Sequence, residues 1–166
     1  EEGDFAWYQG VKLSLFDVRD LENPKEAAKF EIGDRGTDSY ALHDHKAFLF
    51  SKERNLLVIP VTLAVIDKSK YAGELPGSAY GDFVFQGAYV FRISPEEGFV
   101  LRGRITHADP EELKKSGEYY QSNSNVKRSL YMDDYLYTVS DRFVKANSLD
   151  SLREISSVQI SGQTDY

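Results

Sequence analysis

The sequence predicts an all-β fold built from about two and a half four-stranded antiparallel blades of a β-propeller. Three observations predict this fold. Apolar and polar residues alternate with a period of two over many short segments, the segments fall into sets of four, and one set resembles the next. A core made of helices would instead need apolar residues recurring with a period near 3.6.

The first set holds only two predicted strands. Residues 11–16 and 28–32 alternate with a period of two, and Asn23–Pro24 lies between them. Asn followed by Pro favours turn geometry and ends regular structure, so the pair is predicted to be a hairpin. In a four-stranded blade this hairpin would supply strands three and four.

The second set holds four predicted strands, with a polar turn between the first two. The strands are expected over residues 46–51, 56–66, 87–93 and 99–105. In the last of them Phe99, Leu101 and Ile105 share one face, whereas Arg102 and Arg104 share the other. This alternation is typical of a sheet with one buried and one more polar side.

The third set repeats the order with shorter connections. Its strands are expected over residues 127–132, 135–140, 143–147 and 155–160. Asp133–Asp134 is the tight turn between the first two strands. The one predicted helix is short and lies between blades, over residues 109–115, where Asp109 is a capping residue and Pro110 occupies the first turn.

These sets divide the chain into one partial propeller unit: a half blade (residues 1–36), a second blade (37–108) with an insertion (67–86), and a third blade (109–166). A β-sandwich is the alternative, because its strands recur at similar spacing. Residues 45–50 match 127–132 in character, and this repetition of the innermost strand favours the propeller.

The amino-acid composition argues against several classes of function. The formal net charge is −7, which is unsuited to a surface that must neutralise phosphates, so no nucleic-acid partner is expected. Cysteine is absent, which leaves no disulfide or thiolate chemistry. The longest apolar run, residues 56–66, contains Pro60 and falls short of the ~20 residues of a membrane-spanning helix. No membrane-spanning segment is therefore predicted.

Several segments resemble the secreted prokaryotic proteins that carry a C-terminal β-propeller domain. These segments are residues 9–18, 22–25, 32–37, 44–50, 87–91, 102–107 and 127–131. The similarity covers nearly the whole chain, although the family's domain is much longer. The resemblance implies a propeller fold and a location that is secreted or at the cell surface, and it implies no catalytic residues. The chain begins at Glu1 without a signal peptide, so any export signal would lie upstream.

A partial propeller would leave sheet edges exposed. Two copies of about two and a half blades would add up to a five-bladed ring, within the usual range for propellers. Self-association that closes such a ring is therefore one expectation.

Function is expected on the side of the molecule that carries the long connections, residues 33–44, 67–86 and 106–125. Successive strands are antiparallel, so these three connections should emerge on one face. The stretch 67–81 mixes Tyr, Gly and Ser, which suits contacts with a protein or glycan partner. An insertion without a binding role is the alternative.

Two candidate sites lie on this face. First strands line the central channel of a propeller, so the cations His45, Lys46, Lys127 and Arg128 are expected at its mouth, where they would bind an anionic ligand or pair with neighbouring carboxylates. His107, on the same face, is a further candidate ligand-binding residue. The densest set of potential metal ligands, suited to a divalent metal such as calcium, is Asp34, Asp38, His43, Asp44 and His45. Such residues also cap turns, and no cofactor is required by any motif.

The leading interpretation is a non-enzymatic extracytoplasmic propeller module that serves interaction or scaffolding. The alternative is a secreted hydrolase or metal-dependent enzyme with its site on the long-loop face. Ser39 or Ser129 with His45 or His107 would be its nucleophile and base, but no Gly-x-Ser-x-Gly elbow supports the pairing.

Overall fold

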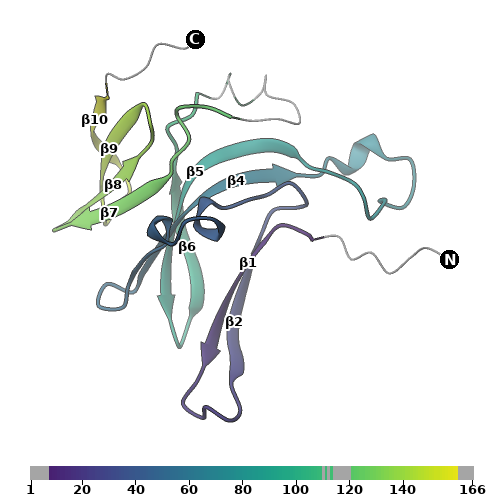
Figure 1. Cartoon of the computed structure of the whole chain (residues 1–166), viewed down its shortest axis with the longest axis horizontal. Helices are drawn as coiled ribbons and strands as arrows, with labels where there is room; N and C mark the ends of the chain where they lie inside the picture. Colours follow the sequence, from purple (N-terminus) through teal and green to yellow (C-terminus); the bar gives the residue numbers. More distant parts are fainter. Residues whose placement is uncertain (1–7, 110, 112, 114–120, 161–166) are drawn as a thin grey trace.

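The computed structural model describes residues 8–109, 111, 113 and 121–160 and is built from three antiparallel sheets (Figure 1). The first is a hairpin of β1 (Val11–Asp17) and β2 (Lys25–Ile32). The second sheet has the order β3 (Leu49–Ser51), β4 (Leu56–Val65), β5 (Asp82–Ser94) and β6 (Gly98–Ile105). The third has the order β7 (Arg128–Met132), β8 (Tyr135–Val139), β9 (Phe143–Ser148) and β10 (Glu154–Gln159).

This arrangement confirms the predicted fold class. Strands follow one another in sequence order within each four-stranded sheet, as they do in propeller blades. Three short 3₁₀ turns, η1 (Tyr40–Leu42), η2 (His45–Ala47) and η3 (Lys68–Lys70), lie in the connections between strands. Among the described residues no helix is long and apolar enough to cross a membrane.

The second sheet is covered on both faces. Along β4 the side chains of Leu57 and Ile59 belong to one core, whereas those of Leu56 and Val58 belong to another. Because successive residues of a strand point to opposite faces, a strand buried on both sides becomes a nearly continuous apolar run. This explains why residues 56–64 are almost entirely apolar.

The first core joins the hairpin to the second sheet. Val11 and Ile32 from the hairpin pack with Leu57, Ile59 and Phe91 of the second sheet. The rings of Phe30 and Phe91 meet edge to face, with centroids 5.0 Å apart. The hairpin thereby covers one face of the second sheet with its own apolar face.

The second core joins the second sheet to the third. Leu56, Val58 and Val90 pack against Leu136 of β8 and Val126, which precedes β7. Hydrogen bonds strengthen this contact: the Arg102 guanidinium donates to the backbone oxygens of Leu149 at 2.7 Å and Asp150 at 2.8 Å. The two sheets are held together by apolar packing in the interior and by polar contacts at the margin.

Several predicted boundaries shift in the structure. The strand expected from residue 46 begins at Leu49, because Asp44 caps the turn η2 and its carboxylate accepts from the Lys46 amide at 2.9 Å. The insertion expected over 67–86 ends earlier, since β5 begins at Asp82 and pairs Phe83 with Ala64. The predicted Asp133–Asp134 turn is confirmed, with Asp133 at φ 47°.

The helix predicted over 109–115 lies partly outside the described residues. Of its predicted features, the capping role of Asp109 is present: its carboxylate accepts from the Glu111 amide at 2.8 Å. The three sheets lie within the residue ranges predicted for the half blade and the two blades. The division at residues 36 and 108 stays a prediction.

Candidate functional site

An ion pair joins the turn η2 to the start of the third sheet. The Arg128 guanidinium lies 2.6 Å from the Asp44 carboxylate, and both side chains are partly exposed. The pKa of Asp44 is lowered, first by the hydrogen bond from the Lys46 amide and then by the charge of Arg128. The structure therefore brings three of the predicted residues, Lys46, Arg128 and Asp44, into one cluster.

The other predicted cations take different places. Lys127 pairs with Asp141 at 2.5 Å, whereas the side chain of His45 is exposed beside Lys46 on η2. Carboxylates thus neutralise Lys127 and Arg128, which matches the alternative that these charges pair with acidic neighbours. Binding of an anion at this cluster stays a prediction.

His107 lies elsewhere, buried between the end of β6 and the third sheet. Its Nε2 is 2.8 Å from Thr138 Oγ1 and its Nδ1 is 3.0 Å from Ser140 Oγ. Burial lowers the pKa of His107 from its ordinary 6.5 to about 4, and the charge of Lys145 acts in the same direction. A neutral, doubly hydrogen-bonded imidazole is a structural group, so His107 does not join the predicted cations.

The five predicted metal ligands are engaged separately. Asp34 accepts from the Ile66 amide at 2.7 Å, Asp38 lies 3.1 Å from His43 Nε2, and Asp44 binds Arg128. Across residues 8–109 and the other described positions, no three His, Asp or Glu side chains form a group that could hold a metal ion. The turn-capping alternative accounts for Asp44, whereas Asp34 holds a distant segment of the chain. Metal binding stays a prediction without geometric support.

The serine residues considered for hydrolysis are not arranged as nucleophiles. Ser39 is buried and its hydroxyl donates to the backbone oxygen of Pro60 at 2.6 Å. The hydroxyl oxygen of Ser129 is also buried. The serine beside His107 is Ser140, whose oxygen already accepts from the Phe143 amide at 2.9 Å. These contacts do not resemble an accessible nucleophile with its base.

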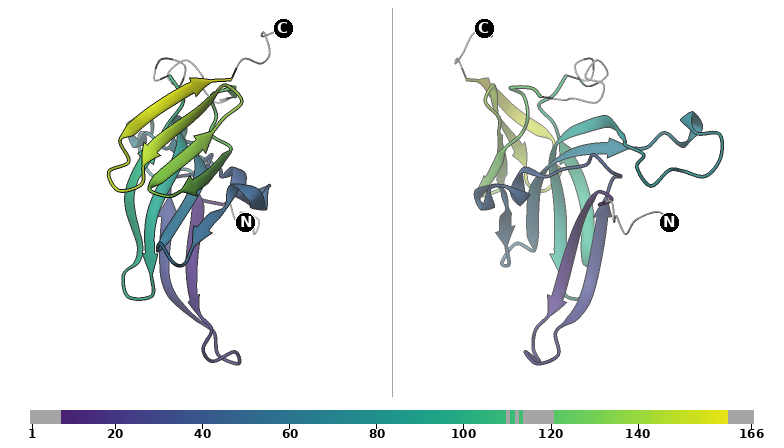
Figure 2. Two further views of the ribbon diagram at one scale, coloured as in Figure 1. Left: turned by 90° about the vertical axis from the view of Figure 1, so that its left-hand side faces the viewer. Right: turned by 45° about the vertical axis from the view of Figure 1, so that its right-hand side comes forward.

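The most prominent feature on the long-loop side is the connection between β4 and β5. We call residues 66–81 the arm; it projects away from the sheets at the right of Figure 1, and Figure 2 shows the same projection from another direction. The short β1–β2 and β5–β6 turns point toward the bottom of the same view. Residues 72–78 of the arm are exposed.

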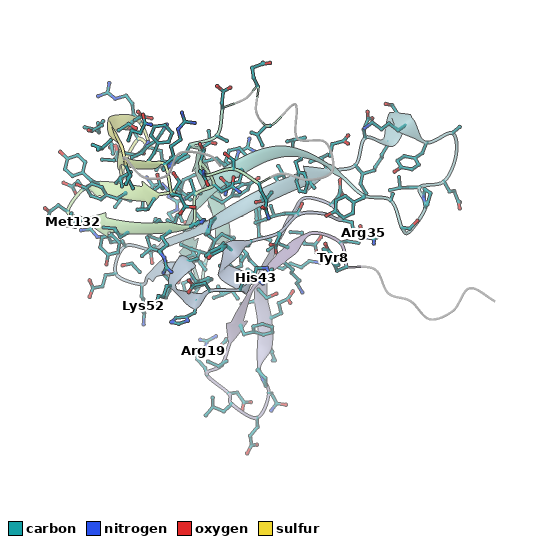
Figure 3. All side chains as sticks on the ribbon, turned by 45° about the horizontal axis from the view of Figure 1, so that its top comes forward. Tyr8, Arg19, Arg35, His43, Lys52 and Met132 are labelled. Atoms are coloured by element: carbon teal, nitrogen blue, oxygen red, sulfur yellow. The ribbon has the colours of Figure 1, made fainter. Side chains whose placement is uncertain are left out.

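The base of the arm is anchored by Arg35, which the sequence did not single out (Figure 3). Its guanidinium donates to the Ser78 oxygen at 2.7 Å, and its own backbone oxygen accepts from the Gly81 amide at 2.8 Å. The guanidinium also lies over the ring of Tyr80, 5.9 Å from its centroid. On the other flank, Lys70 pairs with Asp82 at 2.5 Å.

A second anchor comes from the segment before Arg35. Asp34 accepts from the Ile66 amide, and the hydroxyl of Thr37 both accepts from the Ala64 amide and donates to the Ala64 oxygen at 3.0 Å. Gly33 and Gly36 have φ values of 64° and 105°, which favour glycine. A Cβ at Gly33 would lie 2.1 Å from the Thr37 hydroxyl, so this close approach requires glycine.

Comparison with known proteins supports the fold. A family model described as a beta propeller domain matches residues 1–152. An uncharacterised protein of Methanocaldococcus jannaschii is 26% identical over 130 residues, which are 78% of this chain and 14% of that protein. An uncharacterised protein of Archaeoglobus fulgidus is 23% identical over 150 residues, which are 90% of this chain and 17% of that protein. No solved structure gives a significant match.

The chain therefore spans less than a fifth of the length of either archaeal relative. The match confirms the propeller domain that the sequence resemblance implied. The secreted context that the same resemblance implied stays an expectation.

Proposed function

This chain belongs to the beta propeller domain family, and from that premise we propose that it is a non-enzymatic interaction module that acts outside the cytoplasm on a protein or glycan partner. Propeller sheets form a rigid scaffold whose connecting loops carry the binding groups. The arm is the connection that this chain has elaborated most, and we assign partner binding to it.

A single observation carries this proposal: the arm projects, and its base is held by contacts from a separate segment of the chain. Arg35 and Asp34 bind its two ends from the connection between β2 and β3. Fixing the ends of a loop lowers the conformational entropy that partner binding must remove.

The chemistry of the arm suits a polar, adaptable contact. Tyr71 and Tyr80 supply flat amphipathic rings, and the Gly and Ser residues between them supply exposed backbone for hydrogen bonds. Lys68 and Lys70 balance Asp67 and Glu74, so residues 66–81 carry no net formal charge. A protein surface or a glycan offers hydroxyl and carbonyl groups that match this composition.

The location outside the cytoplasm is supported by the resemblance to secreted prokaryotic propeller proteins. Transfer of the chain's coding sequence to a host with a reporter of export, together with its natural upstream sequence, would test it. Accumulation in the cytoplasm alone would contradict the proposed location.

A five-bladed ring of two copies is not supported by the place of the hairpin. β2 packs beside β6, the outermost strand of the second sheet, so the hairpin occupies the outer half of its blade. Two copies would therefore contribute two outer pairs, and neither copy would contribute the missing inner pair. We do not retain ring closure as the proposed assembly.

Site-specific crosslinking would test the proposed binding surface. A photoreactive residue at Leu75, in the arm, should capture a partner from the cell envelope or from a set of immobilised glycans. The matched control is Leu21, which is 83% exposed at the β1–β2 turn, away from the arm. Equal capture from both positions, or from neither, would contradict binding through the arm.

A further inference from the structure

The third sheet packs on the second with one face and leaves its other face uncovered. Leu136 and Thr138 point toward the second sheet and are fully buried. Successive residues of a strand point to opposite faces, so Tyr135, Tyr137 and Val139 of β8 point away from the second sheet. These three residues and the residues paired with them across the sheet form what we call the outward face. Its apolar members are Leu130, Met132, Tyr135, Tyr137, Val139, Val144, Ala146 and Val158, and Arg128, Ser148 and Ser156 share the face.

Most residues of this face are apolar, and half of the apolar ones are exposed. Leu130, Met132 and Val158 are 43%, 56% and 61% exposed. Figure 2 (left) shows the third sheet toward the viewer, with no described segment lying in front of it. Contiguous exposed apolar surfaces of this kind are rare in monomeric proteins and mark sites of contact.

The outward face corresponds to a surface that is already used for packing between sheets. In the second sheet, the same side of the second and third strands carries Leu56, Val58 and Val90, and these pack on the third sheet. In the third sheet, the equivalent strands β8 and β9 carry Tyr137, Val139 and Val144. The chemistry is therefore that of one more interface between neighbouring blades.

A second copy of this chain is poorly suited to cover the face. In the same head-to-tail relation it would offer the outer side of its hairpin, which carries the ion pairs Lys12–Glu26 at 2.8 Å and Lys29–Glu31 at 3.1 Å. Placing these ion pairs against aliphatic side chains would remove them from water, and the desolvation cost of a buried pair can exceed the attraction within it. The hairpin also lacks the inner strands that would lie over β7 and β8.

We propose that the outward face binds a complete four-stranded propeller blade that lies beyond these 166 residues in a longer polypeptide. The archaeal relatives, of which this chain spans 14% and 17%, have the length to supply such a blade. The bound face of that blade carries aliphatic and aromatic side chains on its second and third strands, as Leu57, Ile59 and Phe91 do in the second sheet.

The absence of cysteine from the sequence makes the proposal testable by thiol labelling. Val158→Cys places one thiol on the outward face, and Ser14→Cys places a matched thiol on the outer side of the hairpin. The probe is a second copy of residues 106–160 appended after Tyr166 as a surrogate blade. It should slow labelling at the original position 158 by about tenfold, as expected for a contact worth ~1.4 kcal/mol, and leave position 14 unchanged.

Two results would overturn the proposal. One is unchanged labelling at position 158 although circular dichroism shows that the appended sheet has formed. The other is labelling of the unextended chain that slows as its own concentration rises, which would assign the face to a second copy.

A separate measurement applies even if the extended chain does not fold. The unextended chain should bind a hydrophobic dye, and Val158→Lys should reduce that binding several-fold, whereas Ser14→Lys should leave it unchanged. Dye binding that responds equally to both substitutions would show that the outward face is not the exposed apolar surface, and the proposal would fail.

Discussion

The outer side of the hairpin and the outward face of the third sheet lie at opposite ends of the same stack of sheets, yet their chemistry differs. The hairpin presents Lys12, Lys29, Glu26 and Glu31 in ion pairs beside the exposed Phe16, whereas the third sheet presents mostly aliphatic and aromatic side chains. Terminal units of repeat proteins need a polar outer face to remain soluble. The hairpin end thus carries paired charges where it meets water, whereas the third-sheet end carries the face to which we assign a further contact.

The largest test of this comparison uses two leucines in the same sheet. Leu136→Ala removes a fully buried side chain from the inward face and should lower the free energy of unfolding by about 2–5 kcal/mol. Leu130→Ala lies on the outward face and should lower it by less than about 1 kcal/mol. Urea denaturation of the two variants measures both effects. Equal losses would show that the outward face is buried in solution, and the proposed difference between the hairpin and the third sheet would then be wrong.

The next effect concerns pH and the inward side of the third sheet. His107 has a folded-state pKa of about 4, below its ordinary 6.5. Between these values the unfolded chain holds the proton and the folded chain does not, so stability falls as the pH drops from 6.5 to 4 and this loss stops below 4. At about 1.4 kcal/mol per pKa unit the full difference is worth about 3 kcal/mol, of which about 2 kcal/mol is lost between pH 7 and pH 4.5.

The loss of stability due to His107 would be measured from the urea midpoints of the wild type, His107→Gln and His43→Gln at pH 7 and pH 4.5. The exposed His43 is the control and should keep the wild-type dependence on pH. A His107→Gln variant that keeps the same dependence would mean that His107 is solvated, and that the second and third sheets separate more easily than their packing implies.

A smaller, local effect is expected in the arm. Arg35→Ala removes the hydrogen bond to the Ser78 oxygen and should raise the rate of tryptic cleavage after Lys68 and Lys70 by roughly fivefold, as a loss of about 1 kcal/mol of local stability predicts. The global unfolding midpoint should change little. Arg142→Ala, at an exposed turn of the third sheet, is the matched control and should leave arm cleavage at the wild-type rate.

The smallest expected effect concerns the ion pair Lys29–Glu31 on the outer side of the hairpin. Lys29 and Glu31 are both more than half exposed, so Lys29→Ala should change the free energy of unfolding by less than about 0.5 kcal/mol. Raising the salt concentration should reduce even that difference. A loss above about 2 kcal/mol in urea denaturation would indicate that the hairpin's outer side is covered, because breaking a buried ion pair is costly.

Most of the fold could be predicted because alternation is local. In a strand such as residues 11–17, the alternation of Val11, Leu13 and Leu15 with polar residues shows within a few positions which side is buried. The strand expected over 87–93 is longer in the structure, since Phe83 and Phe85 join it by pairing with the far end of β4. That pairing depends on residues about twenty positions away, and alternation alone does not report such contacts.

The candidate sites were harder to predict because their contacts are distant in sequence. His107 meets Thr138 and Ser140, which lie 31 and 33 residues further along the chain. Arg35 reaches Ser78 across 43 residues. The flanking Gly33 and Gly36 were a visible signal that the backbone there is constrained, but a glycine does not reveal which segment approaches it.

The double coverage of the second sheet has a consequence for the order in which the protein assembles. A strand such as β4, with Leu57 turned one way and Val58 the other, stays solvated on one side until both neighbours have docked. Amide hydrogens of β4 and β5 should therefore exchange most slowly of all, and loosening either neighbour should speed their exchange together. Folding cooperativity is thus centred on the second sheet. The hairpin and the third sheet pack on its opposite faces, so each is coupled to the other through it.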